Sequence, residues 1–220
     1  VWLDERDQRM VLSILRVYRN FQGLLDYSER DTLTGLLNRK TFDESFLKIA
    51  ADPAAVAGPE AADGRRGAAR RCSYWLGVID IDHFKRVNDG FGHLIGDEVL
   101  LLLSRLMRGS FRYDDRLYRF GGEEFVVLMR CVDGAAATLA LERLRGNVEQ
   151  HEFPQVGHIT VSIGFTEVHP TDTPSGAFER ADKAVYFAKG KGRNQVRHHA
   201  DLVASGELDD AAKVGDVELF

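Results

Sequence analysis

The chain has 220 residues, of which 44% are hydrophobic and 29% charged, values typical of a folded globular protein rather than a disordered one. Its net charge of −5 excludes the basic footprint of a protein that binds nucleic acid polymers, although a nucleotide needs only a few local cations. No apolar run reaches the roughly 18 residues of a membrane span, and no secretory signal is visible.

Residues 1 to about 30 predict one helix, because apolar residues recur at spacings of four and three. These are Leu3, Met10, Ile14, Val17, Phe21 and Leu24. Such a short repeat fits two structures, a coiled coil or a single amphipathic helix lying on its own domain. The chain begins at Val1 without an initiator methionine, so we expect a fragment of a longer protein.

Residues 31 to 197 predict one α/β domain, and residues 198 to 220 a loose tail. A turn at 31–35 precedes a helix at about 38–49, and residues 52–71 form a flexible insertion rich in Ala, Gly, Pro and Arg. We then expect, in order, a strand at 74–82, helices at 83–89 and 96–107, strands at 116–120 and 124–130, a helix at 134–150, a strand at 158–168, a helix at 175–189 and a strand at 194–197. This order predicts a mixed central sheet of about five strands flanked by helices.

Acidic residues cluster at the ends of two predicted strands. Asp80 closes an apolar run, so its carboxylate must be hydrated or paired, whereas Asp82 could cap the helix that begins at His83. Glu123 and Glu124 follow a Gly-Gly turn and repel each other, so a divalent cation would neutralise them. Asp80 and Glu123 on neighbouring strands would form an oxygen-ligand site suited to Mg²⁺, the alternative being a solvated acidic rim.

Three cations lie where phosphate could bind. Lys85 lies in the first turn of a predicted helix, where free N–H groups favour anions. Lys189 and Arg193 are four residues apart around two glycines, in a segment that lacks the P-loop pattern. Taken singly, each of them is better explained as a solvated surface charge. The two cysteines, Cys72 and Cys131, lack metal-ligand spacing and predict reduced thiols.

Taken together, residues from about Asp31 to Val196 resemble the GGDEF family of diguanylate cyclases. The matching motifs are DTLTGLLNR, DIDHFKRVND, GHLIGD, RFGGEEF, TVSIGF and ADKAVYFAKGKGRN. The signature reads GGEEF, with Glu123 in the place of Asp, which keeps the carboxylate. The resemblance implies a sheet of the kind found in nucleotidyl cyclases and polymerase palms, with an N-terminal signalling helix.

The resemblance also assigns roles to individual residues. It implies that Asp80, the backbone carbonyl of Ile81 and Glu123 hold Mg²⁺, with Mn²⁺ as an alternative. Glu123 would also accept the proton of the 3′-hydroxyl, assisted by Glu124. The residues implied to read guanine are Asn88, His93 and Asp97. Those implied to bind the triphosphate are Lys85, Lys189 and Arg193, the backbone at His83 and Phe84, and Gly122, which lets phosphate come close.

The activity implied is the condensation of two GTP molecules into cyclic di-GMP, with release of pyrophosphate. One domain binds one GTP, so the family works as a homodimer, and an upstream sensor domain in the parent protein would set how the two domains face each other. This favours the coiled-coil interpretation of residues 1–30. We expect the domain to lie in the cytoplasm, within a parent protein that could be anchored in a membrane.

A second site is suggested by Arg112 and Asp115, because five residues separate this RxxD pattern from Gly121, as in the family's product-inhibition site. Cyclic di-GMP would bind there, with Arg143 as a further ligand; a surface ion pair is the alternative. A competing function is a catalytically silent module that binds GTP or cyclic di-GMP as a regulator.

Overall fold

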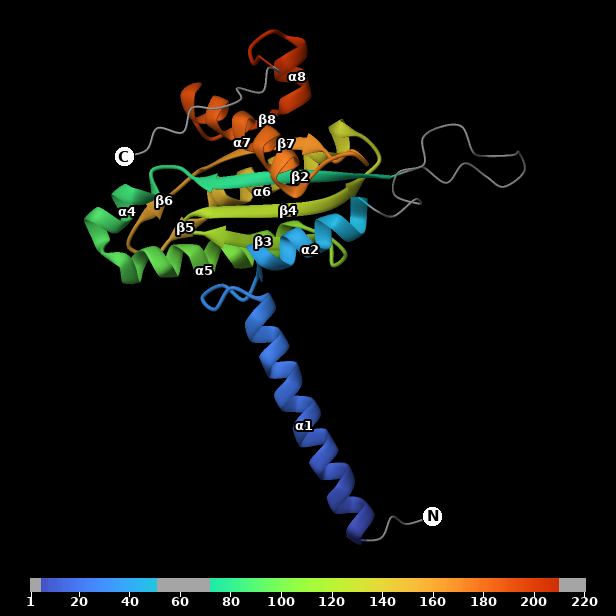
Figure 1. Cartoon of the computed structure of the whole chain (residues 1–220). Coiled ribbons are helices and arrows are strands. Elements are labelled where there is room, and N and C mark those ends of the chain that lie inside the picture. The colour runs from blue at the N-terminus through green and yellow to red at the C-terminus, as the bar shows by residue number, and fades with distance from the viewer. Residues whose placement is uncertain (1–4, 51–71, 210–220) are drawn as a thin grey trace, which may run out of the picture.

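A computed structural model describes residues 5–50 and 72–209, without the side chains of residues 5, 6, 19–27 and 50. A six-stranded mixed sheet forms its centre, in the order β1-β3-β4-β2-β7-β8 (Figure 1). The strands are β1 (Leu37–Asn38), β2 (Ser73–Ile81), β3 (Arg116–Gly121), β4 (Glu124–Cys131), β7 (Val161–Glu167) and β8 (Val196–His198). Only β1–β3 and β7–β8 pair in parallel. The predicted mixed sheet is confirmed, and the two-residue β1 makes it one strand larger than expected.

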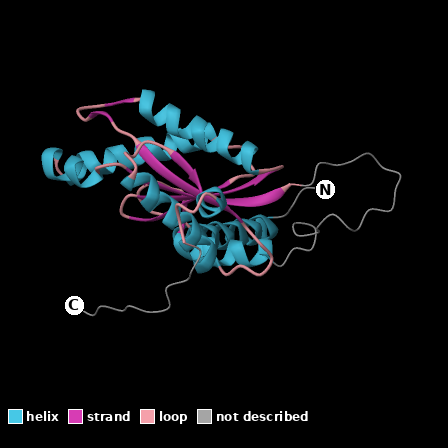
Figure 2. Cartoon of the chain, turned by 90° about the horizontal axis from the view of Figure 1, so that it is seen from above, coloured by secondary structure: helices cyan, strands magenta, loops and turns pink. Residues whose placement is uncertain are grey.

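Helices cover both faces of the sheet, as the view from above shows (Figure 2). The helices of the domain are α2 (Arg39–Ala50), α4 (Phe84–Phe91), α5 (His93–Ser110), α6 (Gly134–Gln150), α7 (Pro174–Gly190) and α8 (His199–Ala204). The two-stranded sheet of β5 (Glu152–Phe153) and β6 (Gly157–His158) lies apart from the main sheet and was not predicted. Among the described residues, no helix combines the length and apolar character that a membrane span needs.

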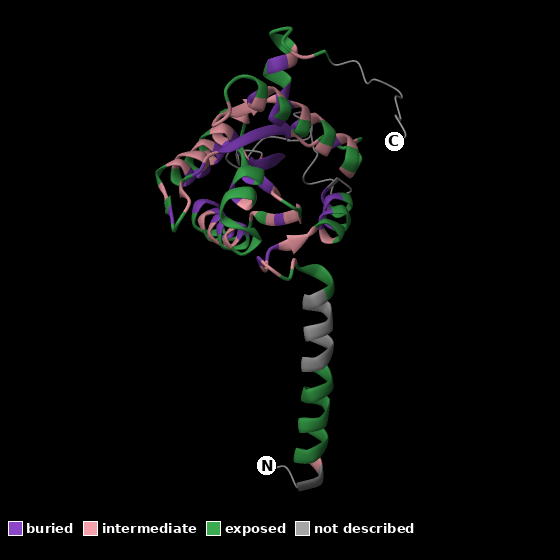
Figure 3. Ribbon diagram, turned by 90° about the vertical axis from the view of Figure 1, so that its left-hand side faces the viewer, coloured by how far each residue is buried: buried purple, intermediate pink, exposed green. Residues whose placement is uncertain are grey.

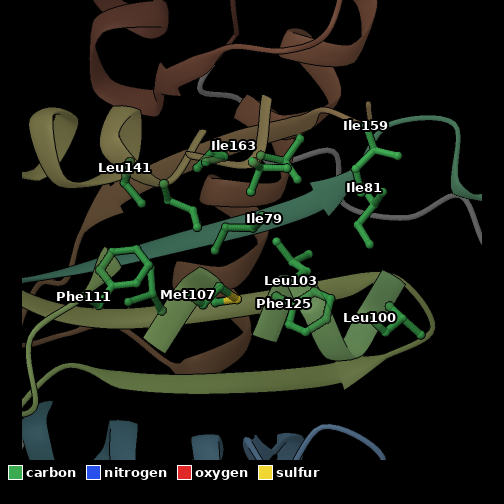
Figure 4. Close-up of a cluster of buried hydrophobic side chains, with 14 of the residues drawn as sticks. Ile79, Ile81, Leu100, Leu103, Met107, Phe111, Phe125, Leu141, Ile159 and Ile163 are labelled. Carbon is green, nitrogen blue, oxygen red and sulfur yellow. The ribbon is translucent and has the colours of Figure 1, made fainter. Parts of the chain in front are cut away.

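Side chains of β2 alternate between two apolar clusters, because successive residues of a strand point to opposite faces. Ile79 and Ile81 pack with α5 and α6 (Figure 4). Leu76 and Val78 pack with α2 and α7 on the other face. Continuous burial from Trp75 to Asp82 explains why this strand reads as an uninterrupted apolar run. Packing on both faces therefore fixes the central strand as far as Asp80 and Asp82 at its end.

The helix α7 crosses β7 at very short range. A Cβ atom on Gly164 would lie 2.1 Å from the carbonyl oxygen of Ala181 and 2.4 Å from the nitrogen of Val185. Only glycine permits this approach, since real side chains do not tolerate such distances. The close contact fixes α7, and with it the end of α7 that carries Lys189, against the face of the sheet.

The N-terminal helix α1 (Glu5–Glu29) projects away from the domain (Figure 1). Its described apolar side chains are exposed, among them Met10, Ile14 and Val17 (Figure 3). The structure thus contradicts the alternative in which an amphipathic helix lies on its own domain.

The C-terminal part of the chain differs from expectation. Residues 199–204 form α8, with His199 and Leu202 buried, so the loose tail predicted from residue 198 onward is wrong for this segment. Residues 205–209 follow α8 without regular structure, whereas the rest of the predicted tail and the whole predicted insertion at 52–71 lie outside the described residues. A helix of six residues is too short to give a clear apolar period, which is why the sequence did not indicate it.

Candidate active site

The two acidic clusters meet across paired strands. Asp80 near the end of β2 is the register partner of Glu124 at the start of β4, and Glu123 precedes Glu124 in the hairpin turn. The turn requires glycine, because Gly121 and Gly122 have φ of 138° and 52°. The predicted hairpin is confirmed, and it brings the three carboxylates together as expected.

Lys189 lies against this acidic group. Its Nζ is 2.7 Å from Oδ1 of Asp80, whose side chain is 10% exposed. Because Lys189 occupies the last turn of α7, the close packing of that helix on β7 delivers the ammonium group to the end of β2. The structure therefore places this predicted phosphate ligand directly beside a predicted metal ligand.

Burial raises the pKa of Asp80, and the charges of Asp82 and Asp182 add to that effect, while the hydrogen bond and charge of Lys189 oppose it. Burial and the charge of Asp80 likewise raise the pKa of Glu123. Burial and the charges of Asp182 and Asp80 raise the pKa of Glu124. Crowded carboxylates that resist ionisation are a natural setting for a bound cation.

Asp182 is a member of this acidic group that sequence reasoning missed. Burial raises its pKa, and its charge acts on both Asp80 and Glu124. The residue lies seven positions before Lys189, which places both on one face of α7. In the sequence, this spacing on a predicted helix is the feature that could have indicated that Asp182 lies near Lys189.

The chemistry of the acidic group suits a hard divalent ion that keeps other oxygen ligands. Within residues 5–50 and 72–209, no group of three or more His, Cys, Asp or Glu side chains is arranged to hold a metal by itself. Asp80 and Glu123 would consequently need oxygens from elsewhere, such as the carbonyl of Ile81 and a bound phosphate. Such a mixed set of oxygen donors suits a divalent cation that binds together with a phosphate.

Asp82 has a different role from the one predicted. The N-cap position of α4 is His83, with φ of 60° and no side-chain cap, so Asp82 is not the cap. Instead the buried Asp82 accepts hydrogen bonds from Thr160 Oγ1 at 2.6 Å and Ser162 Oγ at 2.7 Å. It thereby joins the end of β2 to β7, a contact between residues far apart in the chain.

The predicted guanine-reading residues lie where α4 and α5 meet. Asn88 of α4 lies so close to α5 that a Cβ atom on Gly96 would be 2.0 Å from its Oδ1. Asp97 follows Gly96 directly, and His93 is the first residue of α5, four positions earlier. Asp97 and His93 are exposed, so both are accessible to a ligand.

The predicted phosphate ligands approach from two elements. Phe84 begins α4 and is buried, whereas His83 and Lys85 beside it are exposed at the end of β2. Arg193 comes from the loop after α7 and has a left-handed backbone with φ of 65°. Lys85 therefore comes from α4, whereas Lys189 and Arg193 come from the end of α7 and the loop after it.

The RxxD segment forms the turn between α5 and β3. Asp115 Oδ2 accepts a hydrogen bond from the backbone N–H of Arg112 at 2.9 Å. Arg143 of α6 donates from Nε to the carbonyl oxygen of Ser110 at 2.9 Å. All three predicted inhibitory-site residues line one surface cavity of about 250 Å³, which Cys72 and Cys131 also line, neither of them in a disulfide.

Arg119 of β3 joins the hairpin to the segment after α1. It donates to both carboxylate oxygens of Asp31, at 3.1 and 3.2 Å, and its Nη2 donates to the carbonyl oxygen of Gly122 at 2.8 Å. Burial tends to raise the pKa of Asp31, but hydrogen bonds from Thr34 and the charge of Arg119 hold that pKa below its usual value. The sequence did not indicate this link, because its partners are 88 residues apart.

Comparison with known proteins agrees with this geometry. A family model described as diguanylate cyclase, GGDEF domain, matches residues 64–195. Diguanylate cyclase DgcP of Pseudomonas aeruginosa is 40% identical over 169 residues, which cover 76% of this chain and 23% of that protein. The probable diguanylate cyclase DgcT of Escherichia coli is 35% identical over 84% of this chain and 38% of its own length. The chain thus spans less than half of either relative.

Solved structures share the fold. The coiled coil and GGDEF domain of DgcB from Caulobacter crescentus, in complex with c-di-GMP, is 27% identical with a TM-score of 0.73, over 88% of this chain and 97% of that one. Diguanylate cyclase SiaD of Pseudomonas aeruginosa, solved with its activator SiaC, is 30% identical with a TM-score of 0.67, over 88% and 73% of the two chains. The active GGEEF domain of a diguanylate cyclase from Vibrio cholerae is 30% identical with a TM-score of 0.62, over 74% and 97%.

Proposed function

This chain belongs to the GGDEF-domain family of diguanylate cyclases, and from that premise we propose that it condenses two GTP molecules into cyclic di-GMP and two pyrophosphates. The observation that carries the proposal is the meeting of Asp80, Glu123 and Lys189 at the paired ends of β2 and β4. A solvated acidic rim would not explain why Asp80 is buried with an ammonium group held against it. Nucleotidyl transfer needs carboxylates that can hold a divalent cation and a positive charge beside the phosphates, and this arrangement offers both.

Asp80, Glu123 and the carbonyl of Ile81 would hold a divalent cation, Mg²⁺ or alternatively Mn²⁺. When bound, the cation would neutralise charge on the α-phosphate and favour ionisation of the 3′-hydroxyl. Glu123 would accept the hydroxyl proton, and burial together with the charge of Asp80 raises the pKa of its carboxyl, which favours proton uptake. Glu124 assists by adding negative charge beside it.

Asn88 and Asp97 read the guanine base, with His93 completing the pocket. The Asp97 carboxylate accepts from the N1–H and 2-amino groups, which adenine does not offer on that edge. Lys85, Lys189 and Arg193 bind the triphosphate, and Lys85 offsets charge as pyrophosphate leaves. Backbone N–H groups at His83 and Phe84 contribute, and the glycine at position 122 lets phosphate approach the hairpin.

The protein acts as a homodimer, because one domain binds one GTP and two must face each other. The exposed apolar side chains of α1 support a coiled coil between two copies, and an upstream sensor would act through this helix. Cyclic di-GMP inhibits the enzyme by binding Arg112 and Asp115, with Arg143 as a further ligand. The shared cavity of these three residues supports that assignment.

Turnover of GTP by the purified protein tests the proposal. With Mg²⁺ the wild type should release pyrophosphate, and Glu123→Gln should abolish release, because the amide neither binds the cation well nor accepts the proton. Glu44→Gln, an exposed position on α2, is the matched control and should retain activity. A wild type that binds cyclic di-GMP but turns over no GTP would instead establish the silent regulator.

A further inference from the structure

Asn194, directly after Arg193, holds an unusual backbone conformation. Arg193 and Asn194 have φ of 65° and 46°, so two consecutive non-glycine residues adopt the left-handed conformation. This conformation is unfavourable for most L side chains but is adopted readily by asparagine, so it is at Arg193 that the surroundings must enforce it. The contacts of Asn194 identify what enforces it.

The side chain of Asn194 is held by α6. Its Nδ2 donates to Glu149 Oε1 at 2.6 Å, and its Oδ1 accepts from Arg145 Nη1 at 2.8 Å. The donor end faces a carboxylate and the acceptor end faces a guanidinium, so one orientation of the amide satisfies both partners. Arg145 is itself held by Glu149 at 2.8 Å and by Glu142 at 2.7 Å.

The backbone of Asn194 is held by Asp82, the residue that follows β2. Its N–H donates to Asp82 Oδ2 at 3.0 Å, and the same carboxylate accepts from Thr160 and Ser162. Asp82 is 4% exposed, so these donors satisfy a charge that has little access to water. Asn194 therefore joins α6 to the end of β2, two residues beyond Asp80.

We propose that Asn194 is a positioning residue that aims Arg193 at the triphosphate of the substrate. The proposal rests on the proposed function, in which Arg193 binds phosphate. A guanidinium recognises phosphate through a planar fork, so its affinity depends on orientation as well as charge. The loop before it is also held, because Ala188 O accepts from the Arg193 N–H at 2.9 Å and from Gln195 Nε2 at 2.8 Å. With the backbone fixed on both sides of Arg193, its Cα–Cβ bond has one direction, which limits where the guanidinium can reach.

Two variants disrupt the contacts between Asn194 and α6 by different routes: Asn194→Gly removes both, and Glu149→Ala removes one and leaves the hydrogen bond from Arg145. Asn194→Gly tolerates positive φ and keeps the N–H donor to Asp82, so it removes only the side-chain contacts. Glu149→Ala removes the carboxylate from the partner side, and Glu149 is 44% exposed, so the core stays intact. Glu142→Ala is the matched control, because Glu142 contacts Arg145 without contacting Asn194.

The readout is the Kd of a non-hydrolysable GTP analogue, with thermal unfolding recorded for every variant. Asn194→Gly and Glu149→Ala should each weaken binding by about tenfold, the scale of one well-oriented charged contact. Glu142→Ala should stay within about twofold of the wild type. In the Arg193→Ala background Glu149→Ala should have no further effect, because it acts only through Arg193.

The outcomes separate this proposal from the proposed function. If Arg193→Ala weakens binding but Glu149→Ala and Asn194→Gly do not, the positioning role is wrong while the phosphate role of Arg193 stands. An effect of Glu149→Ala that persists in full in the Arg193→Ala background also overturns it, since a general structural role would produce that result. If Arg193→Ala leaves the Kd unchanged, the phosphate role fails and the positioning role fails with it. None of these measurements requires turnover.

Discussion

At the scale of single residues, the site depends on carboxylates whose charge the fold makes unfavourable. Asp80, Glu123, Glu124 and Asp182 all have raised pKa values, because burial and their mutual charges disfavour ionisation. A carboxyl whose pKa rises on folding lowers stability at pH values above that pKa, since the folded state must carry the unfavourable charge. A cation bound among these groups relieves the repulsion.

Mg²⁺ should therefore raise the melting temperature of the wild type, and the rise should be largely lost in Glu123→Gln. Without the metal, Glu123→Gln should itself melt roughly 2 °C above the wild type at pH 7, because one repelling charge is gone. Thermal unfolding with and without Mg²⁺ measures both effects. Glu179→Gln, an exposed position on α7, should respond to Mg²⁺ like the wild type. An equal response in Glu123→Gln would exclude Glu123 as a metal ligand.

Asp172 shows the opposite shift. Burial alone would raise its pKa, but the hydrogen bonds and charge of Arg180 and the N–H of His169 hold the pKa below its ordinary value of 3.8. Asp172→Asn should thus destabilise the protein by about 2 kcal/mol at pH 7. Because the pKa is lowered on folding, the difference is full above the ordinary value and should shrink as the pH falls below about 4. Denaturant unfolding at pH values above and below about 4 measures the difference in unfolding free energy between the wild type and Asp172→Asn. A difference that does not change with pH would contradict a lowered pKa of Asp172.

At the scale of elements, the packing of α4 on α5 defines the predicted guanine pocket. The Cβ atom of Gly96→Ala would fall 2.0 Å from Asn88 Oδ1, so Asn88 must move. We expect the Kd of a GTP analogue to weaken by about tenfold, which is the loss of one specific base contact. Gly109→Ala lies on the same helix with no atom within 4 Å and should leave binding unchanged. Equal affinity in both variants would place the guanine pocket elsewhere.

Local patterns predicted the long elements and the motifs on them, because amphipathic periods and glycine turns depend on neighbouring residues. The hairpin at Gly121 and the helix at 134–150 are examples, and both are confirmed. What local patterns missed depends on contacts between distant residues. Asp82 was predicted as a cap because His83 follows it, whereas its partners are 78 and 80 residues away. The contacts of Asn194 with α6 were missed for the same reason.

At the scale of the whole molecule, α1 is a helix whose apolar side chains remain uncovered. Ile14 is 60% and Val17 69% exposed, although both belong to the predicted apolar repeat. Ile14→Asp combined with Val17→Asp should dissociate the proposed homodimer and reduce turnover in proportion, because charges are excluded from a coiled-coil seam. Arg16→Asp, between them in sequence but on another side of the helix, should leave the dimer intact. For each variant, sedimentation velocity measures the oligomeric state, and a turnover assay at the same protein concentration measures the activity. A monomeric wild type with full activity would contradict the requirement for a dimer.

The most direct test of the proposed activity is the identity and stoichiometry of the product. Dimeric wild-type protein incubated with Mg²⁺ and GTP should form cyclic di-GMP, identified by its mass, with two pyrophosphates released for each molecule made. ATP in place of GTP should give no cyclic product, since Asn88 and Asp97 are the proposed readers of guanine. Formation of cyclic di-GMP with GTP and Mg²⁺, and of no cyclic product with ATP and Mg²⁺, would support the assignment of this site to catalysis. A confirmed dimer that binds GTP and Mg²⁺ but forms neither cyclic di-GMP nor pyrophosphate would contradict it.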